Sequence, residues 1–134
     1  MSKMCNECFE IYSDFYEYNV CAKCNCVCGD IVYIDDLLQS TIQILNKKLF
    51  TTLYCCSAHT YDKTSSCYIK FDDEVDLPNI PNGFSYDNED FTIIRKKIKS
   101  KSILGRHKEI CENSIILLEW ASSLPKNPLK NIDI

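Results

Sequence analysis

The sequence predicts an α+β fold, in which a small zinc-ribbon-like finger over residues 1–34 is attached to a compact core domain over residues 35–134. The chain has 134 residues, of which 46% are hydrophobic and 25% charged, as in an ordinary folded domain. Six of its ten cysteines lie in the first 28 residues. The rest of the chain has the spacing of two helices and the composition of three or four strands. We expect the finger and the core to pack as one unit.

Two Cys-x-x-Cys pairs, Cys5 with Cys8 and Cys21 with Cys24, predict a metal site in the finger. Two residues between the cysteines let one tight turn direct both sulfurs at the same ion. The second pair follows after twelve residues, which is the length of a hairpin. Four thiolates leave no coordination position for water or substrate, as in structural Zn²⁺ sites. The sequence therefore predicts one structural Zn²⁺ bound by these four cysteines.

Other cysteines can take the ligand role of the second pair, since Cys26 and Cys28 follow Cys24 at alternate positions. In an extended strand these three side chains share one face, so Cys26 or Cys28 can replace a proposed ligand or bind a second metal. Another interpretation is that the segment holds free or buried thiols. Asn25 tolerates the left-handed conformation that a metal-binding turn needs, which favours Cys21 with Cys24.

Two helices are expected in the core domain. The first begins with Asp35 or Asp36 as its cap and continues to about Lys48. Its apolar residues fall at three- and four-residue spacing, at Leu38, Ile42, Leu45 and Leu49. The second helix covers residues 102–122. One stripe of this helix consists of Ile103, His107, Ile110, Ser114, Leu117 and Ala121.

Strands are expected where short runs are rich in aromatic, Thr and Ile residues, at residues 50–56, 67–71 and 91–98. Residues 72–90 predict a loop, because Pro78 and Pro81 interrupt them and they have no apolar periodicity. This loop carries seven acidic residues and no basic one, whereas residues 91–108 carry seven basic residues and no acidic one. The simplest interpretation is mutual neutralisation, and the alternative is that the basic block binds a partner.

Residues 53–59 (LYCCSAH) form the second cysteine cluster, at the end of an expected strand, where ligand-contacting residues are common. Small side chains there let a ligand approach the backbone. We expect an anion-binding pocket, since neighbouring cations such as Arg106 supply charge and a hydroxyl supplies a directed donor. Its expected residues are Tyr54, Ser57, His59, Tyr68, Lys70 and Arg95. The alternative is a strand end with one buried cysteine and a surface histidine.

The motifs DDLLQSTIQILNKKLFTTLYCCSAH, CYIKFDDEVDLPNIP, TIIRKK and ILLEWASSLP resemble a group of small Firmicutes and phage proteins. The similarity spans nearly the whole chain and includes an N-terminal CxxC…CxxC finger and a C-C-S-G-H motif. Ala58 stands where that group has glycine, which implies a turn that accepts a Cβ. A shorter stretch, Cys55 to His59 with Leu45-Asn46 before it, resembles the wybutosine-synthesis methyltransferase family. That resemblance implies a strand and turn beside a nucleotide-sized pocket.

Charge and motifs narrow the function. A net charge of −4 argues against general coating of nucleic acids, and no apolar run suits a signal peptide or a membrane span. We expect a cytoplasmic protein, in the host cytoplasm if phage-encoded, that binds a small anionic, nucleotide-like ligand or sequesters or inhibits a host protein. A nucleic-acid-binding zinc protein is the alternative, supported by the basic block. An enzyme acting on a nucleotide or RNA is less favoured, because no catalytic motif is present.

Overall fold

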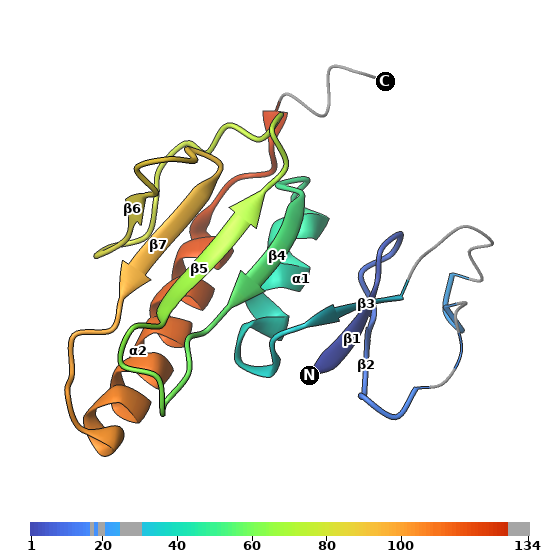
Figure 1. Ribbon diagram of the computed structural model, residues 1–134. Coiled ribbons are helices and arrows are strands. Elements are labelled where there is room, and N and C mark those ends of the chain that lie inside the picture. Colours follow the sequence, from blue (N-terminus) through green and yellow to red (C-terminus); the bar gives the residue numbers. More distant parts are fainter. Residues whose placement is uncertain (17, 19–20, 25–30, 129–134) are drawn as a thin grey trace.

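The structure is a computed structural model that describes residues 1–16, 18, 21–24 and 31–128. An antiparallel four-stranded sheet in the order β4-β5-β7-β6 forms the centre of the core domain. Helices α1 (Gln39–Lys47) and α2 (Ile103–Ser123) lie on the same face of this sheet and leave its other face uncovered (Figure 1). The strands are β4 (Thr52–Cys56), β5 (Ser66–Phe71), β6 (Ser85–Tyr86) and β7 (Ile93–Lys97). The expected α+β class is confirmed.

Capping side chains set the start of the helical turn before α1 and the start of α2. Asp35 Oδ1 accepts a hydrogen bond from the amide of Leu37 at 2.9 Å and caps the short 3₁₀ helix η1 (Asp36–Leu38), which leads into α1. Ser102 caps α2 in the same way, because its hydroxyl accepts from the amide of Gly105 at 3.0 Å. Both helices lie where the sequence predicted them, and Asp35 rather than Asp36 is the cap.

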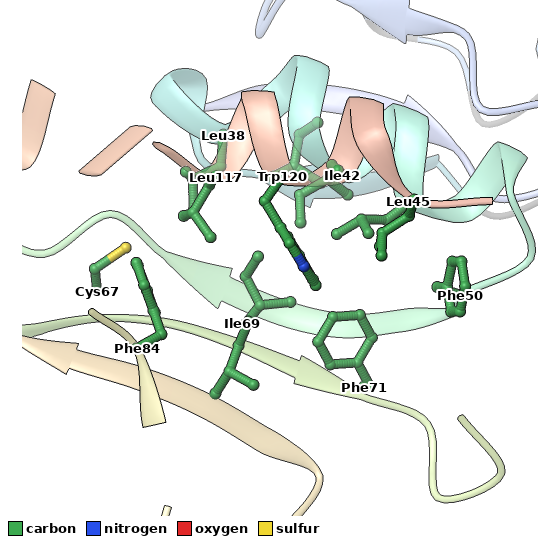
Figure 2. Packing of buried hydrophobic residues seen from close by; sticks show 14 of the residues in the cluster. Leu38, Ile42, Leu45, Phe50, Cys67, Ile69, Phe71, Phe84, Leu117 and Trp120 are labelled. Atoms are coloured by element: carbon green, nitrogen blue, oxygen red, sulfur yellow. The ribbon is translucent and has the colours of Figure 1, made fainter. Parts of the chain in front are cut away.

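The main core fills the space between the helices and the sheet (Figure 2). Alternation along β5 directs Ile69 and Phe71 toward the helices and Lys70 toward the uncovered face. Trp120 of α2 reaches into this core, and its indole N–H donates to Asn79 Oδ1 at 2.8 Å, so the buried ring keeps a polar partner. Other buried members of the core are Leu38, Ile42, Leu45, Phe50, Cys67, Phe84 and Leu117.

The end of α1 is tied to the end of α2. Lys48 Nζ donates to the carbonyl oxygens of Ala121, Ser122 and Leu124, at 2.8, 2.9 and 2.5 Å. In the opposite direction the amide of Asn127 donates to the carbonyl oxygen of Lys48 at 2.8 Å. A positive charge is favourable at a helix C-terminus. The last residues of α2 are therefore fixed by a side chain far away in the sequence.

A second antiparallel sheet, in the order β2-β1-β3, forms the finger. Met4 and Ile34 of this sheet are buried in the same apolar cluster as the core residues. Gln43 on α1 also donates to the carbonyl oxygen of Phe9 at 2.8 Å. The finger thus packs against α1, although the proposed boundary near residue 34 stays a prediction. Its strands are β1 (Ser2–Cys5), β2 (Ile11–Tyr12) and β3 (Ile31–Ile34).

The buried face of α2 matches the predicted stripe only in part, at Ile110, Leu117 and Ala121. Ile103 and His107 are exposed, whereas Arg106 is buried. The guanidinium of Arg106 donates to the carbonyl oxygens of Thr60 and Lys101, which satisfies its polar head inside the protein. Arg106 is therefore occupied by backbone and not offered to a ligand, contrary to expectation.

The loop predicted over residues 72–90 contains one further element. Its residues Ser85 and Tyr86 form β6, which pairs with Arg95 and Ile94 of β7. Two residues without apolar alternation give no strand signal in the sequence, so only the pairing with β7 reveals them. Among the described residues, no helix has the length and apolar character needed to cross a membrane.

Candidate metal centre and anion-binding face

Four cysteine thiols converge in the finger. Cys5 ends β1 and Cys8 follows after a turn, while Cys21 and Cys24 flank a second turn. Their four sulfurs all lie within 4.8 Å of one another. The Sγ atoms of Cys5 and Cys24 are 3.7 Å apart, and those of Cys8 and Cys21 are 3.5 Å apart. The structure thus brings together the four cysteines that the sequence predicted as ligands.

These distances fit one tetrahedral ion. With Zn–S bonds of about 2.3 Å, the sulfurs of a tetrahedral site lie about 3.8 Å from one another. A disulfide needs sulfurs about 2.05 Å apart, and none of the described cysteines forms one. Cys5 and Cys21 are buried, whereas Cys24 is exposed and gives an ion access from solvent. The cluster can therefore hold a metal ion.

Hydrogen bonds stabilise the thiolate form of these ligands. The amide of Glu7 donates to Cys5 Sγ at 3.4 Å, and the amide of Cys24 donates to Cys21 Sγ at 3.5 Å. The hydroxyl of Tyr12 lies 3.0 Å from Cys21 Sγ. Burial opposes ionisation of Cys21, but its hydrogen bonds outweigh burial and lower the pKa of this thiol to about 6. The same contact with Cys21 raises the pKa of Tyr12 to about 12. A deprotonated thiol is the form that binds metal.

The first turn needs an uncommon backbone conformation. Phe9, directly after Cys8, has a φ of 66°, in the left-handed region that favours glycine. Its amide donates to the carbonyl oxygen of Cys5 at 3.0 Å and closes the turn. The Phe9 side chain packs against the apolar cluster, which offsets the conformational cost. The alternative ligands Cys26 and Cys28 lie outside the described residues.

Four of the six residues predicted for the ligand pocket lie on the uncovered face of the main sheet. Tyr54 pairs with Lys70 across β4 and β5, and Tyr68 pairs with Arg95 across β5 and β7. Because side chains alternate along a strand, these four point away from buried Ile69. The Arg95 guanidinium lies over the Tyr68 ring, 4.9 Å from its centroid, in a cation–π contact.

The remaining two predicted residues, Ser57 and His59, follow the end of β4 rather than lying on a strand. Ser57 is only 5% exposed, and both its amide and its hydroxyl donate to Asp35 Oδ2, at 2.9 and 2.8 Å. Ser57 therefore links the end of β4 to Asp35, the cap of η1. Its amide and hydroxyl both donate to this carboxylate, so the hydroxyl proton is not available to a ligand. His59 is exposed, and its Nε2 lies 3.6 Å from Cys56 Sγ.

Two of the predicted cations already have anionic partners. Lys70 Nζ lies 2.6 Å from Asp90 Oδ2. The hydrogen bonds from Lys70 and Thr92 lower the pKa of Asp90 to about 2. Arg95 Nε donates to Asp87 Oδ1 at 3.2 Å. Asp87 thus neutralises one member of the basic block, as the simplest interpretation of the charge pattern predicted.

Two cavities beside β7 share Arg95 and Lys97. The first has a volume of about 300 Å³ and lies between β6 and β7, and the second has about 400 Å³ and extends to Ser66. The first is lined by four cations and a single carboxylate, namely Arg95, Lys96, Lys97, Lys99 and Asp87. Sequence reasoning missed Lys97 and Lys99 as site residues. The alternation of β7 was the available signal, since it places Lys97 on the same face as Arg95.

No family model, no curated protein and no solved structure matches this chain. The resemblances carried by the sequence motifs therefore stay predictions. The function is inferred from the geometry of the two sites alone.

Proposed function

We propose that this protein is a zinc protein whose core domain binds a small anionic ligand in the cavity between β6 and β7. The observation that carries the proposal is the excess of positive charge around that cavity, where Lys97 and Lys99 join Arg95 against the single carboxylate of Asp87. A cavity of about 300 Å³ suits a compact ligand such as a phosphate ester or a mononucleotide.

Zinc is the metal that the finger favours. Thiolates are soft ligands, and four of them at tetrahedral spacing are characteristic of Zn²⁺. Such a site has no open position, so the metal stabilises structure and takes no part in a reaction. The three-stranded finger contributes few side chains to the core, among them Met4 and Ile34, so we expect its fold to depend on the ion.

Arg95 is the residue best placed to orient an anion. Its Nε donates to Asp87 and its Nη1 to Ser66, while the Tyr68 ring supports the plane of the guanidinium. Arginine has five N–H donors in a rigid fork, and the described partners use only part of them. Lys97 and Lys99 are exposed and have no ion-pair partner among the described residues, so their charge is available to a ligand.

Calorimetric titration with inorganic pyrophosphate and with a nucleoside monophosphate tests the anion site. We expect saturable binding, weakened at least about tenfold in the double variant Lys97→Gln/Lys99→Gln through loss of charge-assisted hydrogen bonds. Lys108→Gln with Lys126→Gln is the control, because it removes the same charge at exposed positions away from the cavity. Absence of saturable binding, or an equal loss in the control, would contradict the proposal.

Binding to nucleic acid needs a separate test. An electrophoretic shift with single-stranded RNA would give an affinity that falls steeply with salt if phosphates along a strand were contacted. We expect little shift near physiological salt, because residues 1–36 carry seven acidic side chains against two basic ones and repel a long polyanion. A strand bound far more tightly than a mononucleotide would favour the nucleic-acid alternative.

A further inference from the structure

A cysteine–histidine pair lies outside the metal centre and the cavities beside β7. Cys56 is the last residue of β4, half-buried at the uncovered face, and His59 follows in the turn. His59 Nε2 is 3.6 Å from Cys56 Sγ. We propose that Cys56 is a nucleophilic thiol, activated by His59, that forms mixed disulfides with small disulfide compounds.

The turn after β4 supplies a second donor to the same sulfur. The amide of Ala58 donates to Cys56 Sγ at 3.4 Å. This geometry requires Ala58 to adopt a φ of 83°, in the left-handed region that a residue with a Cβ rarely adopts. Contacts of buried Ala58 with Ile98 and Ile110 hold the turn in this conformation. A backbone N–H and a protonated imidazole both stabilise a thiolate.

The backbone of His59 is fixed on both sides. Its amide donates to Ser65 Oγ at 2.9 Å, and its carbonyl oxygen accepts from the amide of Asp62 at 3.1 Å. The next carbonyl, that of Thr60, accepts from buried Arg106. The imidazole is therefore exposed to solvent on a held backbone, beside the thiol whose proton it can take.

The neighbouring thiols lack this environment. Burial raises the pKa of Cys55 to about 11 and that of Cys67 to about 12, so both stay protonated near neutral pH. Since the thiolate is the reactive form, Cys56 is the reactive member of these three. Adjacent strand residues point to opposite faces, so Cys55 cannot easily displace a group bound to Cys56. A mixed disulfide at Cys56 therefore persists until an external thiol removes it.

The reaction balances without a further oxidant. The proton of the Cys56 thiol passes to His59 Nε2, and the sulfur attacks one sulfur of the disulfide compound. The bond between Cys56 and that sulfur forms while the original sulfur–sulfur bond breaks, and the leaving thiolate takes the electron pair. His59 then gives up the proton to the released thiolate or to water.

Charged and titratable groups surround the pair on all sides. On the uncovered face Tyr68 lies opposite Cys56, and Arg95 lies opposite Tyr68 on the next strand. Asp62, in the loop after His59, interacts electrostatically with its imidazole. Tyr54 lies on the same face of β4 as Cys56, whereas Cys55 and Cys67 lie on the opposite, helix-facing side of the sheet.

The test is the reaction of the zinc-loaded chain with dithiodipyridine, followed by the release of coloured thiopyridone and by peptide mass mapping. Trypsin releases residues 49–63 as one peptide whose cysteines are Cys55 and Cys56. We expect rapid modification of this peptide, which the Cys56→Ser variant loses. His59→Ala should slow it about threefold both at pH 7 and at pH 6, because the side chain that accepts the thiol proton is gone.

Cys111 is a matched control. Its Sγ lies 3.8 Å from His107 Nε2 on α2, but no described backbone amide donates to its sulfur. His107→Ala should leave the rate at Cys56 unchanged, and Cys111 should react more slowly than Cys56. The proposal is overturned if Cys56 reacts no faster than Cys111, or if His59→Ala leaves the Cys56 rate unchanged at both pH values. The Lys97→Gln/Lys99→Gln variant should keep the wild-type rate of Cys56 modification. The reactive thiol and the anion site can therefore be refuted independently.

Discussion

The carboxylate of Asp35 holds Ser57 through two hydrogen bonds, from the amide at 2.9 Å and from the hydroxyl at 2.8 Å, both to Oδ2. The other oxygen, Oδ1, caps η1 at Leu37. One side chain thus joins the first helical turn of the core to the end of β4. The turn that carries His59 starts from this point.

Replacing Asp35 with Ala should lower the free energy of unfolding by about 2–4 kcal/mol. The helix cap contributes about 1 kcal/mol, and a buried Ser57 left without an acceptor costs about 1–3 kcal/mol. Ser57→Ala removes one hydroxyl contact and should cost about 1 kcal/mol. Urea unfolding measures the free energy of unfolding of these two variants and of a control. The control, Asp36→Ala at the exposed neighbouring position, loses a hydrogen bond from the Ser2 hydroxyl and an ion pair with the N-terminal ammonium group, and should cost no more than about 1 kcal/mol; equal losses for Asp35 and Asp36 would contradict the expected difference.

Purified protein should contain close to one equivalent of zinc, and Cys5→Ser should lose most of it, because three thiolates no longer close a tetrahedral site. Elemental analysis measures the bound zinc. The change in circular dichroism on addition of a chelator measures how far the fold of the finger depends on it. Cys111→Ser, away from the finger, should keep the zinc. If Cys21→Ser keeps the metal and Cys28→Ser loses it, Cys28 and not Cys21 is the ligand. Metal-free protein with a fully folded finger would refute the site.

Stability should fall at acid pH in a way that depends on Asp90. Its pKa is lowered to about 2 in the folded protein, first through the hydrogen bond from Lys70, so folding favours the ionised carboxylate. The ionised pair therefore stabilises the fold fully above the ordinary carboxyl pKa, and this contribution is lost as the pH falls from about 4 through 2. The melting temperature of Asp90→Asn should start lower and decline less steeply over this range. Asp73→Asn, exposed in the same acidic loop, should follow the wild-type slope.

Half-buried Lys96 and fully buried Asn113 form a polar pair that should show strong coupling. Lys96 Nζ donates to Asn113 Oδ1 at 2.8 Å, while Asn113 Nδ2 has no partner among the described residues. Asn113→Leu alone removes the acceptor of the ammonium and should cost about 1–3 kcal/mol. Lys96→Met together with Asn113→Leu should recover most of that loss, since no unpaired polar group remains. Additive losses in a double-mutant cycle would show that the pair is not coupled.

Local signals predicted both helices and three of the four strands of the main sheet. Asp35 and Ser102 are strong capping residues, and the Cys-x-x-Cys spacing places two sulfurs on each turn whatever surrounds them. Strand alternation was enough to put Tyr68 and Lys70 on one face of β5. These features depend only on neighbours in the sequence, and for that reason they could be predicted.

The errors concern contacts between residues far apart in the chain. Ser57 looked like a ligand donor because nothing in the sequence shows that Asp35, on another element, takes its hydroxyl. Arg106 looked like a surface cation, although the carbonyl of Thr60 satisfies it inside the protein. Neither partner is within helical or strand spacing, so only the tertiary fold identifies them.

The hydrogen bonds between Lys48 and the end of α2 have a consequence for synthesis on the ribosome. Lys48 is translated long before the carbonyl groups of Ala121 and Leu124 that it binds. The helical layer that covers the sheet therefore cannot be completed until residues 121–124 have left the exit tunnel. The finger has all its described thiols within the first 24 residues and is free to capture its ion earlier. The finger of the growing chain can thus bind an ion while β4 and β5 are not yet covered by α2.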